Sequence, residues 1–435
     1  MVSDRAHCRQ SGLPPSAATW QYGCSWRTTA LPNNLISLED IQEAQERIRS
    51  TALYTPSIHS TSFSRMTERD VWLKAENLQR AGSFKIRGAM NVISQLDAAT
   101  RRTGVVAASA GNHAQGVALA AQSLGVPATV FMPETAPLPK VQATREYGAA
   151  IQLTGTSLED AVVAAREFAA ESGARFIHPY DDAAIVTGQG TLGIEIVEQI
   201  PDAGTVVIPV GGGGLIAGSA VALKTLRPDL IIVGVEIATA NTYELSRQNG
   251  APTPVPPRPT VADGIAVHEP SQLAFDHIER FVDELVTVDD PQAMRAVALL
   301  LERAKLMVEA SGAVGLAALL EGKLDTLPDP YVIVLSGGNI DLLLLNRVIR
   351  GGLAAAGRFA WYRIRIPDVP GQLAGLLDVI ASCGGNVASV EHYREEGGVP
   401  IGFTEVLIAV ETRGPEHSAE LSEALGSRGL VAGRE

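Results

Sequence analysis

TVVIPVGGGGLIAG, residues 205–218, joins an apolar β-branched run to four consecutive glycines and then to an aliphatic run of helical composition. A strand, a glycine turn and a helix in this order are typical of an open α/β sheet, whose ligands lie at the carboxyl ends of the strands. Four glycines leave backbone N–H groups accessible at a helix N-terminus, which favours phosphate binding. The stretch therefore predicts an α/β fold with a phosphate site. Its candidate ligands are the glycines Gly211, Gly212, Gly213 and Gly214.

The same alternation recurs on both sides of this stretch. VVAAS at 105–109 and PATVFMP from Pro127 predict strands that are each followed by a helix. Further strands are predicted at IIVGVE from Ile231 and at YVIVLSGGN from Tyr331. Short strands that alternate with helices indicate parallel strands with crossover helices. Residues 36–357 are therefore predicted to form one catalytic domain with doubly wound parallel sheets.

Ordered structure is predicted to begin at ISLEDIQEAQERI, which starts at Ile36. Ser37 is a suitable helix N-cap, and Ile41 and Ile48 recur at helical spacing. Residues 1–35 mix Arg and Pro without periodicity, and they lack the continuous apolar segment of a secretory signal. We expect them to be a disordered N-terminal extension.

A different pattern begins near Arg358. The segments WYRIRI, PDVPGQ, a helix to Cys383, NVASVEHYR, IGFTEVLIAV, a polar helix and GLVAGRE predict a β-α-β-β-α-β order. That order is the ferredoxin-like unit. The unit is too small to hold the chemistry of the larger region, so residues 358–435 are predicted to form a separate domain that binds a ligand or dimerises.

Composition and charge limit the possible functions. Hydrophobic residues make up 46% and charged residues 19%, which is typical of a globular α/β protein. The net charge of −13 argues against a nucleic-acid partner, because phosphate backbones bind clustered Lys and Arg. Cys8, Cys24 and Cys383 are too scattered for a disulfide framework, and apolar runs are too short to span a bilayer. We expect a cytoplasmic protein without membrane or nucleic-acid partners.

AGSFKIRGA, from Ala81, places Lys85 between Phe84 and Ile86. The chain has only six lysines. A desolvated lysine amine has a lowered pKa and acts as a nucleophile and Schiff-base former. A lysine among apolar residues more often extends its amine to solvent. Taken alone, the motif leaves both interpretations open.

Two further loops follow predicted strands. ASAGNHAQG, from Ala108, would expose backbone N–H groups at a helix N-terminus, suited to a carboxylate or phosphate. The alternative is a tight turn with Asn112 as a cap, and His113 is expected to be structural. LSGGN, from Leu335, ends a strand whose Ser336 could place its hydroxyl against a ring nitrogen. In isolation LSGGN indicates only a turn.

A dinucleotide site is the rival interpretation of the glycine run. Gly212, Gly214 and Ala217 fit the G-x-G-x-x-A pattern, and Glu236 ends the following strand at about the expected spacing. A nicotinamide oxidoreductase is thus an alternative. That activity would leave Lys85 and Asn112 without a role. A Walker motif is not indicated, because no Lys-Ser or Lys-Thr pair follows the glycines.

Taken together, SFKIRGA, SAGNHAQG, GGGGL and SGGN resemble, in order and spacing, the pyridoxal-phosphate threonine and serine dehydratases of fold type II, which are tryptophan-synthase-like. The similarity extends from about Ile36 to Gly352. The resemblance implies the cofactor pyridoxal 5'-phosphate and a threonine ammonia-lyase activity that forms 2-oxobutanoate and ammonia. L-Serine, giving pyruvate, is the second expected substrate, and isoleucine biosynthesis is one expected setting.

The resemblance also implies roles for individual residues. Lys85 would bind the cofactor covalently and remove the α-proton of the substrate. Asn112 would contact the cofactor's 3-oxygen, Gly211 to Leu215 its phosphate, and Ser336 its pyridine nitrogen. The substrate would be bound by Ser83, Ser109, Ala110, Gly111 and His113.

The segment from Trp361 resembles an ACT domain, an amino-acid-sensing module, with PDVPGQL as its signature loop. By this resemblance Asp368, Gly371 and Asn386 are candidate effector-binding residues, although simple turn formation also explains them. Paired ACT domains favour a homo-oligomer, as a dimer or tetramer. The effector could be isoleucine, valine or a nucleotide, or the domain could have none.

Alternatives to the dehydratase remain open at this point. Serine racemases of the family tend to have a second Ser where this chain has Ala110, which favours the dehydratase. Some relatives bind a divalent cation through a carboxylate that matches Glu236, but Thr242 replaces their second acidic ligand, so no metal site is expected. A nicotinamide oxidoreductase and a non-catalytic amino-acid sensor are the remaining alternatives.

Overall fold

The computed structural model describes residues 35–394, 399–430 and 432–434, so the predicted extension lies outside the described residues except for Leu35. Helix α1 (Leu38–Ile48) begins as predicted at Ser37, which forms a capping box with Asp40. Its inward face is Ile41, Ala44 and Ile48. Within the described residues, no helix combines the length and apolar composition needed to cross a bilayer.

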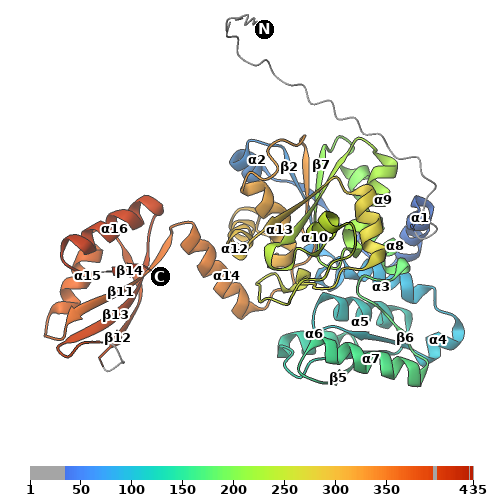
Figure 1. Ribbon diagram of the computed structural model, residues 1–435, viewed down its shortest axis with the longest axis horizontal. Helices are drawn as coiled ribbons and strands as arrows, with labels where there is room; N and C mark the ends of the chain where they lie inside the picture. Colours follow the sequence, from blue (N-terminus) through green and yellow to red (C-terminus); the bar gives the residue numbers. More distant parts are fainter. Residues whose placement is uncertain (1–34, 395–398, 431, 435) are drawn as a thin grey trace, which may run out of the picture. The chain divides into compact units, whose positions relative to one another are not determined.

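The larger of the two sheets that precede Arg358 has the strand order β1-β2-β10-β7-β8-β9 (Figure 1). Its strands are β1 (Ser57–His59), β2 (Val71–Lys74), β7 (Thr205–Pro209), β8 (Ile231–Ile237), β9 (Glu284–Val288) and β10 (Tyr331–Val334). All neighbours pair in parallel except β1 with β2. The predicted parallel arrangement is confirmed for this sheet, and the antiparallel edge strand β1 was not foreseen.

Successive residues of these strands point alternately into two hydrophobic cores, one on each face of the sheet. Val207, Val233 and Ile333 pack in the cluster that includes α13 (Ala310–Leu320), whereas Val206 and Val332 pack in the cluster that includes α9. The strands are buried on both faces, as expected for a parallel sheet covered by helices. The helices of this part are α2 (Thr61–Thr67), α8 (Ala183–Gln199), α9 (Gly214–Leu226), α10 (Thr242–Asn249), α11 (Gln272–Phe281), α12 (Asp290–Leu299) and α14 (Leu342–Ala355).

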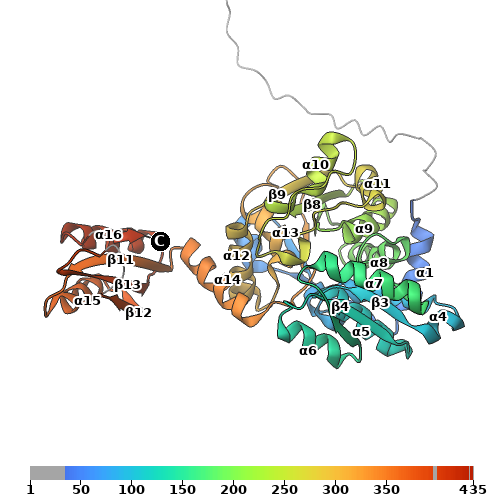
Figure 2. The same cartoon turned by 60° about the horizontal axis from the view of Figure 1, so that its bottom comes forward.

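The second of these sheets is smaller and fully parallel, in the order β5-β4-β3-β6. It comprises β3 (Val105–Ala108), β4 (Ala128–Met132), β5 (Ala150–Leu153) and β6 (Arg175–Phe176). Figure 2 shows α5 (Asn112–Leu124) and α7 (Leu158–Ser172) on opposite faces of this sheet. The helices α3 (Lys85–Ser94), α4 (Ala98–Thr103) and α6 (Leu138–Glu146) complete this part. The catalytic region therefore contains two sheets, and α3 packs against both α5 and α8.

Residues after Arg358 form a four-stranded antiparallel sheet in the order β12-β13-β11-β14. Its elements are β11 (Phe359–Pro367), α15 (Gln372–Ser382), β12 (Asn386–Tyr393), β13 (Phe403–Glu411), α16 (Pro415–Ser427) and β14 (Ala432–Arg434). This is the β-α-β-β-α-β order predicted from the sequence. The short last strand pairs with β11 between Tyr362 and Ile364.

Helices α8 and α9 approach each other closely because glycines line their crossing. A methyl group on Gly218 would lie 2.1 Å from the carbonyl oxygen of Val186 and 2.7 Å from the amide nitrogen of Gly190. Both neighbours are backbone atoms that cannot rotate away. The crossing therefore requires glycine at position 218, and it fixes the helix that begins in the four-glycine turn.

We expect Gly218→Ala to lower the free energy of unfolding by about 1–3 kcal/mol, because overpacking forces the two helices apart. Gly375→Ala is the matched control, since Gly375 lies in the exposed part of α15 with no atom within 4 Å of an added methyl group. The control should raise helix stability by about 0.5–1 kcal/mol. Thermal and urea denaturation check both values. A neutral Gly218→Ala would contradict the close crossing.

Candidate active site

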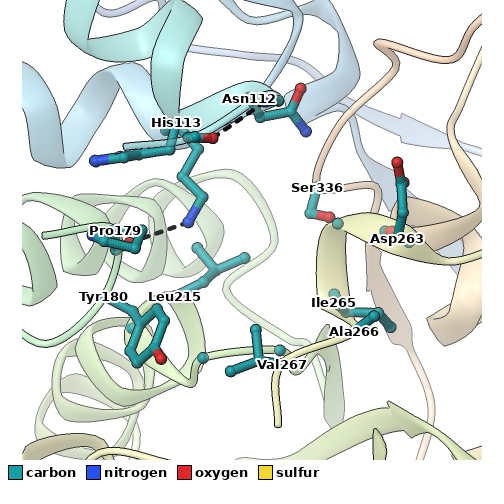
Figure 3. A pocket seen from close by; sticks show the side chains of 18 of the residues that line it. Asn112, His113, Pro179, Tyr180, Leu215, Asp263, Ile265, Ala266, Val267 and Ser336 are labelled. Atoms are coloured by element: carbon teal, nitrogen blue, oxygen red, sulfur yellow. Dashed lines mark hydrogen bonds between the residues drawn. The ribbon is translucent and has the colours of Figure 1, made fainter. Parts of the chain in front are cut away.

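The predicted loops converge on one pocket of about 340 Å³. The ends of β3, β7 and β10 and the start of α3 all contribute to its lining, which is where ligands of parallel sheets are expected. Figure 3 shows Asn112 and His113 on one side, Tyr180 on another, and Ser336 with Asp263 opposite. The volume of the pocket is within the range of small-molecule binding sites. The motifs singled out in the sequence thus belong to a single site.

Lys85 is the first residue of α3, and its side chain enters this pocket. The Nζ atom donates a hydrogen bond to the carbonyl oxygen of Pro179 at 3.0 Å. Desolvation lowers the pKa of the amine to about 8, although the negative charge of Glu309 partly opposes this shift. Lowering the pKa in this way makes a lysine available as a nucleophile near neutral pH.

A buried ionic network holds the first turn of α3 behind this lysine. The Arg87 guanidinium donates to both carboxylate oxygens of Glu76 at 2.8 Å and to Glu195 at 2.6 and 3.0 Å. Lys74 donates to the same Glu195 at 2.6 Å. Two cations and two anions are thus paired away from water, where a single unpaired charge would be strongly destabilising. The network fixes Arg87, two residues along the helix from Lys85.

Three glycines of the four-glycine turn, Gly211, Gly212 and Gly213, are packed where a side chain would not fit. A methyl group added to Gly211 would lie 2.8 Å from Ile265. One added to Gly212 would lie 2.2 Å from the Tyr180 ring, and one added to Gly213 would lie 2.7 Å from the Tyr243 hydroxyl. Gly213 also has a φ of 81°, in the left-handed region that favours glycine. The turn therefore presents bare backbone to the pocket at the N-terminus of α9, which suits an anion.

Asn112 is held between two polar side chains. Its Nδ2 donates to Glu309 Oε1 at 2.6 Å, and its Oδ1 accepts from Asn339 Nδ2 at 2.9 Å. Burial raises the pKa of Glu309 to about 7, with the charge of Asp263 adding to the shift. These contacts fix which end of the Asn112 amide is the donor.

The other predicted residues occupy different positions. Ser109 Oγ accepts from the Gly111 amide at 3.1 Å, and Ala110 and Ser336 also line the pocket. His113 is buried with Nε2 at 2.9 Å from the Ile177 carbonyl, and burial lowers its pKa to about 3, so the ring is neutral. Ser83 is not among the residues that line the pocket, and its backbone pairs with that of Gly337 in an isolated β-bridge.

Several pocket residues were missed by sequence reasoning. Glu309 lies in the apolar run LMVEASGAVGL, and the criterion that selected Lys85 would have selected it too. Asn339 closes the SGGN motif. Lys140, at the start of α6, and Asp263 form an ion pair of 2.9 Å between the two sheet regions. No local pattern distinguishes these last two residues.

The dinucleotide interpretation relied in part on the position of Glu236 at the end of a strand, and the structure gives the Glu236 carboxylate partners within the protein. Glu236 is fully buried, and its two oxygens accept from the backbone amides of Tyr243 and Glu244, each at 2.8 Å. Among the described residues, no group of three or more His, Cys, Asp or Glu side chains is arranged to hold a metal ion.

A desolvated lysine amine and an anion-binding turn in one pocket define an enzyme that binds an aldehyde cofactor bearing an anionic group. The pyridoxal-phosphate dependent enzyme family matches residues 48–337, and the chain belongs to this family. The chain is 45% identical over 395 residues to the L-threonine ammonia-lyase of Thermotoga maritima, covering 91% of this chain and 98% of that protein.

Solved structures agree with the family. The processed form of threonine deaminase isoform 2 from Solanum lycopersicum is similar with a TM-score of 0.70 and 35% identity, covering 74% of this chain and 87% of that one. Maize serine racemase is similar with a TM-score of 0.69 and 36% identity, covering 73% and 98%. The α/β fold of this pyridoxal-phosphate enzyme family is thereby established for the catalytic region.

The residues present fit pyridoxal phosphate. The aldehyde requires a neutral amine, and Lys85 supplies one whose pKa is about 8. The phosphate requires bare N–H donors, and within the described part of the chain no hydrogen bond uses the amides of Gly211 to Gly213. A methyl group on any of these glycines would collide with its neighbours.

The lowered pKa of Lys85 gives a testable pH dependence. We expect the fraction of Lys85 that reacts with trinitrobenzenesulfonate in the cofactor-free protein to rise with a midpoint near pH 8, because the amine is neutral above its pKa. In Glu309→Gln the midpoint should fall further, since the carboxylate raises the pKa of Lys85. Peptide mass spectrometry measures the modified fraction. A midpoint near 10.5, the ordinary lysine value, would show that the amine is solvated.

Proposed function

We propose that this protein is an L-threonine ammonia-lyase that converts L-threonine to 2-oxobutanoate and ammonia, and L-serine to pyruvate and ammonia, with pyridoxal phosphate as cofactor. The observation that carries the proposal is the desolvated amine of Lys85 in the same pocket as the four-glycine turn. The similarity to the Thermotoga maritima enzyme over 91% of the chain supports the choice of substrate.

The pocket residues divide between cofactor and substrate. Lys85 would hold the cofactor covalently, the amides from Gly211 to Leu215 would hold its phosphate, and Ser336 would face its ring nitrogen. Asn112 would contact its 3-oxygen, since Glu309 and Asn339 already fix the orientation of the Asn112 amide. When bound, the cofactor supplies an electron sink for the pair left at the α-carbon.

Lys85 is the group that would transfer the proton. A base works best when its pKa lies near the working pH, and burial brings this amine to about 8. Once the amine of the amino acid has replaced Lys85 on the cofactor, the freed Lys85 amine would remove the α-proton. The loop from Ser109 to His113 begins α5 and would orient the substrate carboxylate through its backbone N–H groups. His113 is neutral and would add no charge there.

Serine racemization is the second candidate activity, supported by the similarity to maize serine racemase. A racemase needs a proton-transferring group on each face of the α-carbon. Ala110 lines the pocket with a methyl group, which transfers no proton. Elimination is therefore the favoured activity, and D-serine should form from L-serine far more slowly than pyruvate.

We expect Lys85→Ala to lower keto-acid release from L-threonine by on the order of 10²–10⁴-fold, because both covalent attachment and proton transfer are lost. Borohydride treatment of the holoenzyme should place a pyridoxyl group on the peptide containing Lys85. Lys305→Ala is the control, because Lys305 is an exposed lysine that donates to the Glu302 carbonyl. An adduct on another lysine, or full activity without Lys85, would refute the assignment.

We also propose that residues 358–435 form an ACT-like regulatory domain that binds a branched-chain amino acid. Its antiparallel sheet order supports this assignment. Asp368 Oδ1 pairs with Arg394 Nε at 3.3 Å, and Gly371 is the N-cap of α15 with a φ of 92°. Asn386 pairs in register with Glu411 at the opposite end of the sheet from Asp368.

The position of Asn386 has a consequence for assembly. Asn386 and Glu411 align with Phe359, whereas Asp368 follows Pro367 at the other end of β11. The two ends of β11 are eight residue steps apart, which is about 26 Å at about 3.3 Å per residue. One domain therefore cannot bring Asp368 and Asn386 to one amino acid. An effector site that used both residues would need two copies of the chain, which is the arrangement that the proposed homo-oligomer would provide.

Isoleucine should raise the melting temperature of the holoenzyme and change its rate of keto-acid release. Asp368→Ala should increase the isoleucine concentration required for both effects by about tenfold, as for the loss of one hydrogen bond to a charged group. Light scattering should give a dimer or tetramer. If neither isoleucine nor valine alters stability or rate, the regulatory proposal is wrong, and the catalytic proposal is unaffected.

A further inference from the structure

Glu236 and Tyr243 lie outside the pocket lining, yet both connect to the four-glycine turn. Helix α10 begins after Asn241, whose side chain makes no capping hydrogen bond. The first amides of a helix lack partners within the helix. Glu236, at the end of β8, supplies these partners by accepting from Tyr243 and Glu244 at 2.8 Å. A buried carboxylate from a different element therefore caps α10.

This cap fixes Tyr243, whose side chain is fully buried. The Tyr243 hydroxyl donates to the Gly212 carbonyl oxygen at 2.9 Å and accepts from the Ser271 amide at 3.2 Å. Ser271 in turn caps α11 through the Ala274 amide at 3.0 Å. The hydroxyl thus connects the turn to the starts of two helices and has no freedom to rotate away.

The hydrogen bond to Gly212 determines where the next amide points. In a trans peptide the C=O and N–H groups point in opposite directions. Since the Gly212 carbonyl is directed to Tyr243, which does not line the pocket, the Gly213 N–H is directed to the other side of the turn. Gly213 lines the pocket, and its amide has no partner in the described part of the chain.

We propose that Glu236 and Tyr243 are positioning residues that hold the four-glycine turn in its anion-binding conformation, acting through the Gly212 carbonyl. The inference rests on the proposed function, because the anion is the phosphate of the cofactor. Without the hydroxyl, the peptide between Gly212 and Gly213 loses the contact that orients it. Both residues therefore act on the phosphate and not on the rest of the cofactor.

Comparing two ligands tests this directly. In cofactor-free protein, Tyr243→Phe should weaken pyridoxal phosphate binding by about 5–10-fold, the loss expected for one hydrogen bond. Pyridoxal, which has the same aldehyde without the phosphate, should bind the variant and the wild type within twofold. Glu236→Gln should behave in the same way, because an amide offers one acceptor for two backbone donors. Absorbance titration gives both affinities.

Tyr331→Phe is the matched control. Tyr331 is equally buried, and its hydroxyl lies 2.6 Å from the Leu324 carbonyl oxygen and 2.7 Å from that of Leu327, so its single O–H donates to these carbonyls, away from the turn. This variant should lose stability without changing the ratio of the two affinities. Equal weakening of both ligands in Tyr243→Phe, or no weakening of pyridoxal phosphate, would overturn the proposal. Failure of the wild type to form the Lys85 adduct would instead overturn the proposed function.

Discussion

The site depends on keeping one primary amine out of water beside a turn of bare backbone amides. Lys85 has the Pro179 carbonyl as its hydrogen-bond partner, and this poor solvation brings its pKa to about 8. The turn requires glycine because Ile265, Tyr180 and Tyr243 occupy the space that side chains would need, and in the described part of the chain no hydrogen bond uses the amides of Gly211 to Gly213. Amine and turn belong to different elements, so their relation depends on the packing of α3, α8 and α9.

That packing combines two kinds of contact. Glycines such as Gly218 let α8 and α9 approach to backbone distance, while Arg87 ties α3 to Glu76 and Glu195 through paired charges. Apolar burial has no directional preference, whereas paired charges have strict geometric requirements. The network therefore defines the rotation and register of α3, and with them the direction of the amine. An apolar replacement of similar volume could be as stable without defining that direction.

Local features of this protein could be predicted from the sequence, and long-range ones could not. The cap at Ser37 and the strand-turn-helix at the four glycines follow from neighbouring residues, and both are present. The division into two sheets depends on β10 pairing with β2, some 260 residues earlier, and no periodicity encodes that contact. Glu309 was missed because only lysine was examined for isolation in an apolar run, although a carboxylate there carries the same information.

The ion pair between Lys140 and Asp263 bears on how substrate enters. The pair joins the two sheet regions beside the pocket, and its side chains are 22% and 55% exposed. An exposed pair of this kind contributes about 0–1 kcal/mol, which is comparable to thermal energy. Thermal energy is therefore enough to separate the two side chains. A contact this weak does not lock the two sheet regions together around the pocket that both residues line, so it sets no strong barrier to the entry of an amino acid.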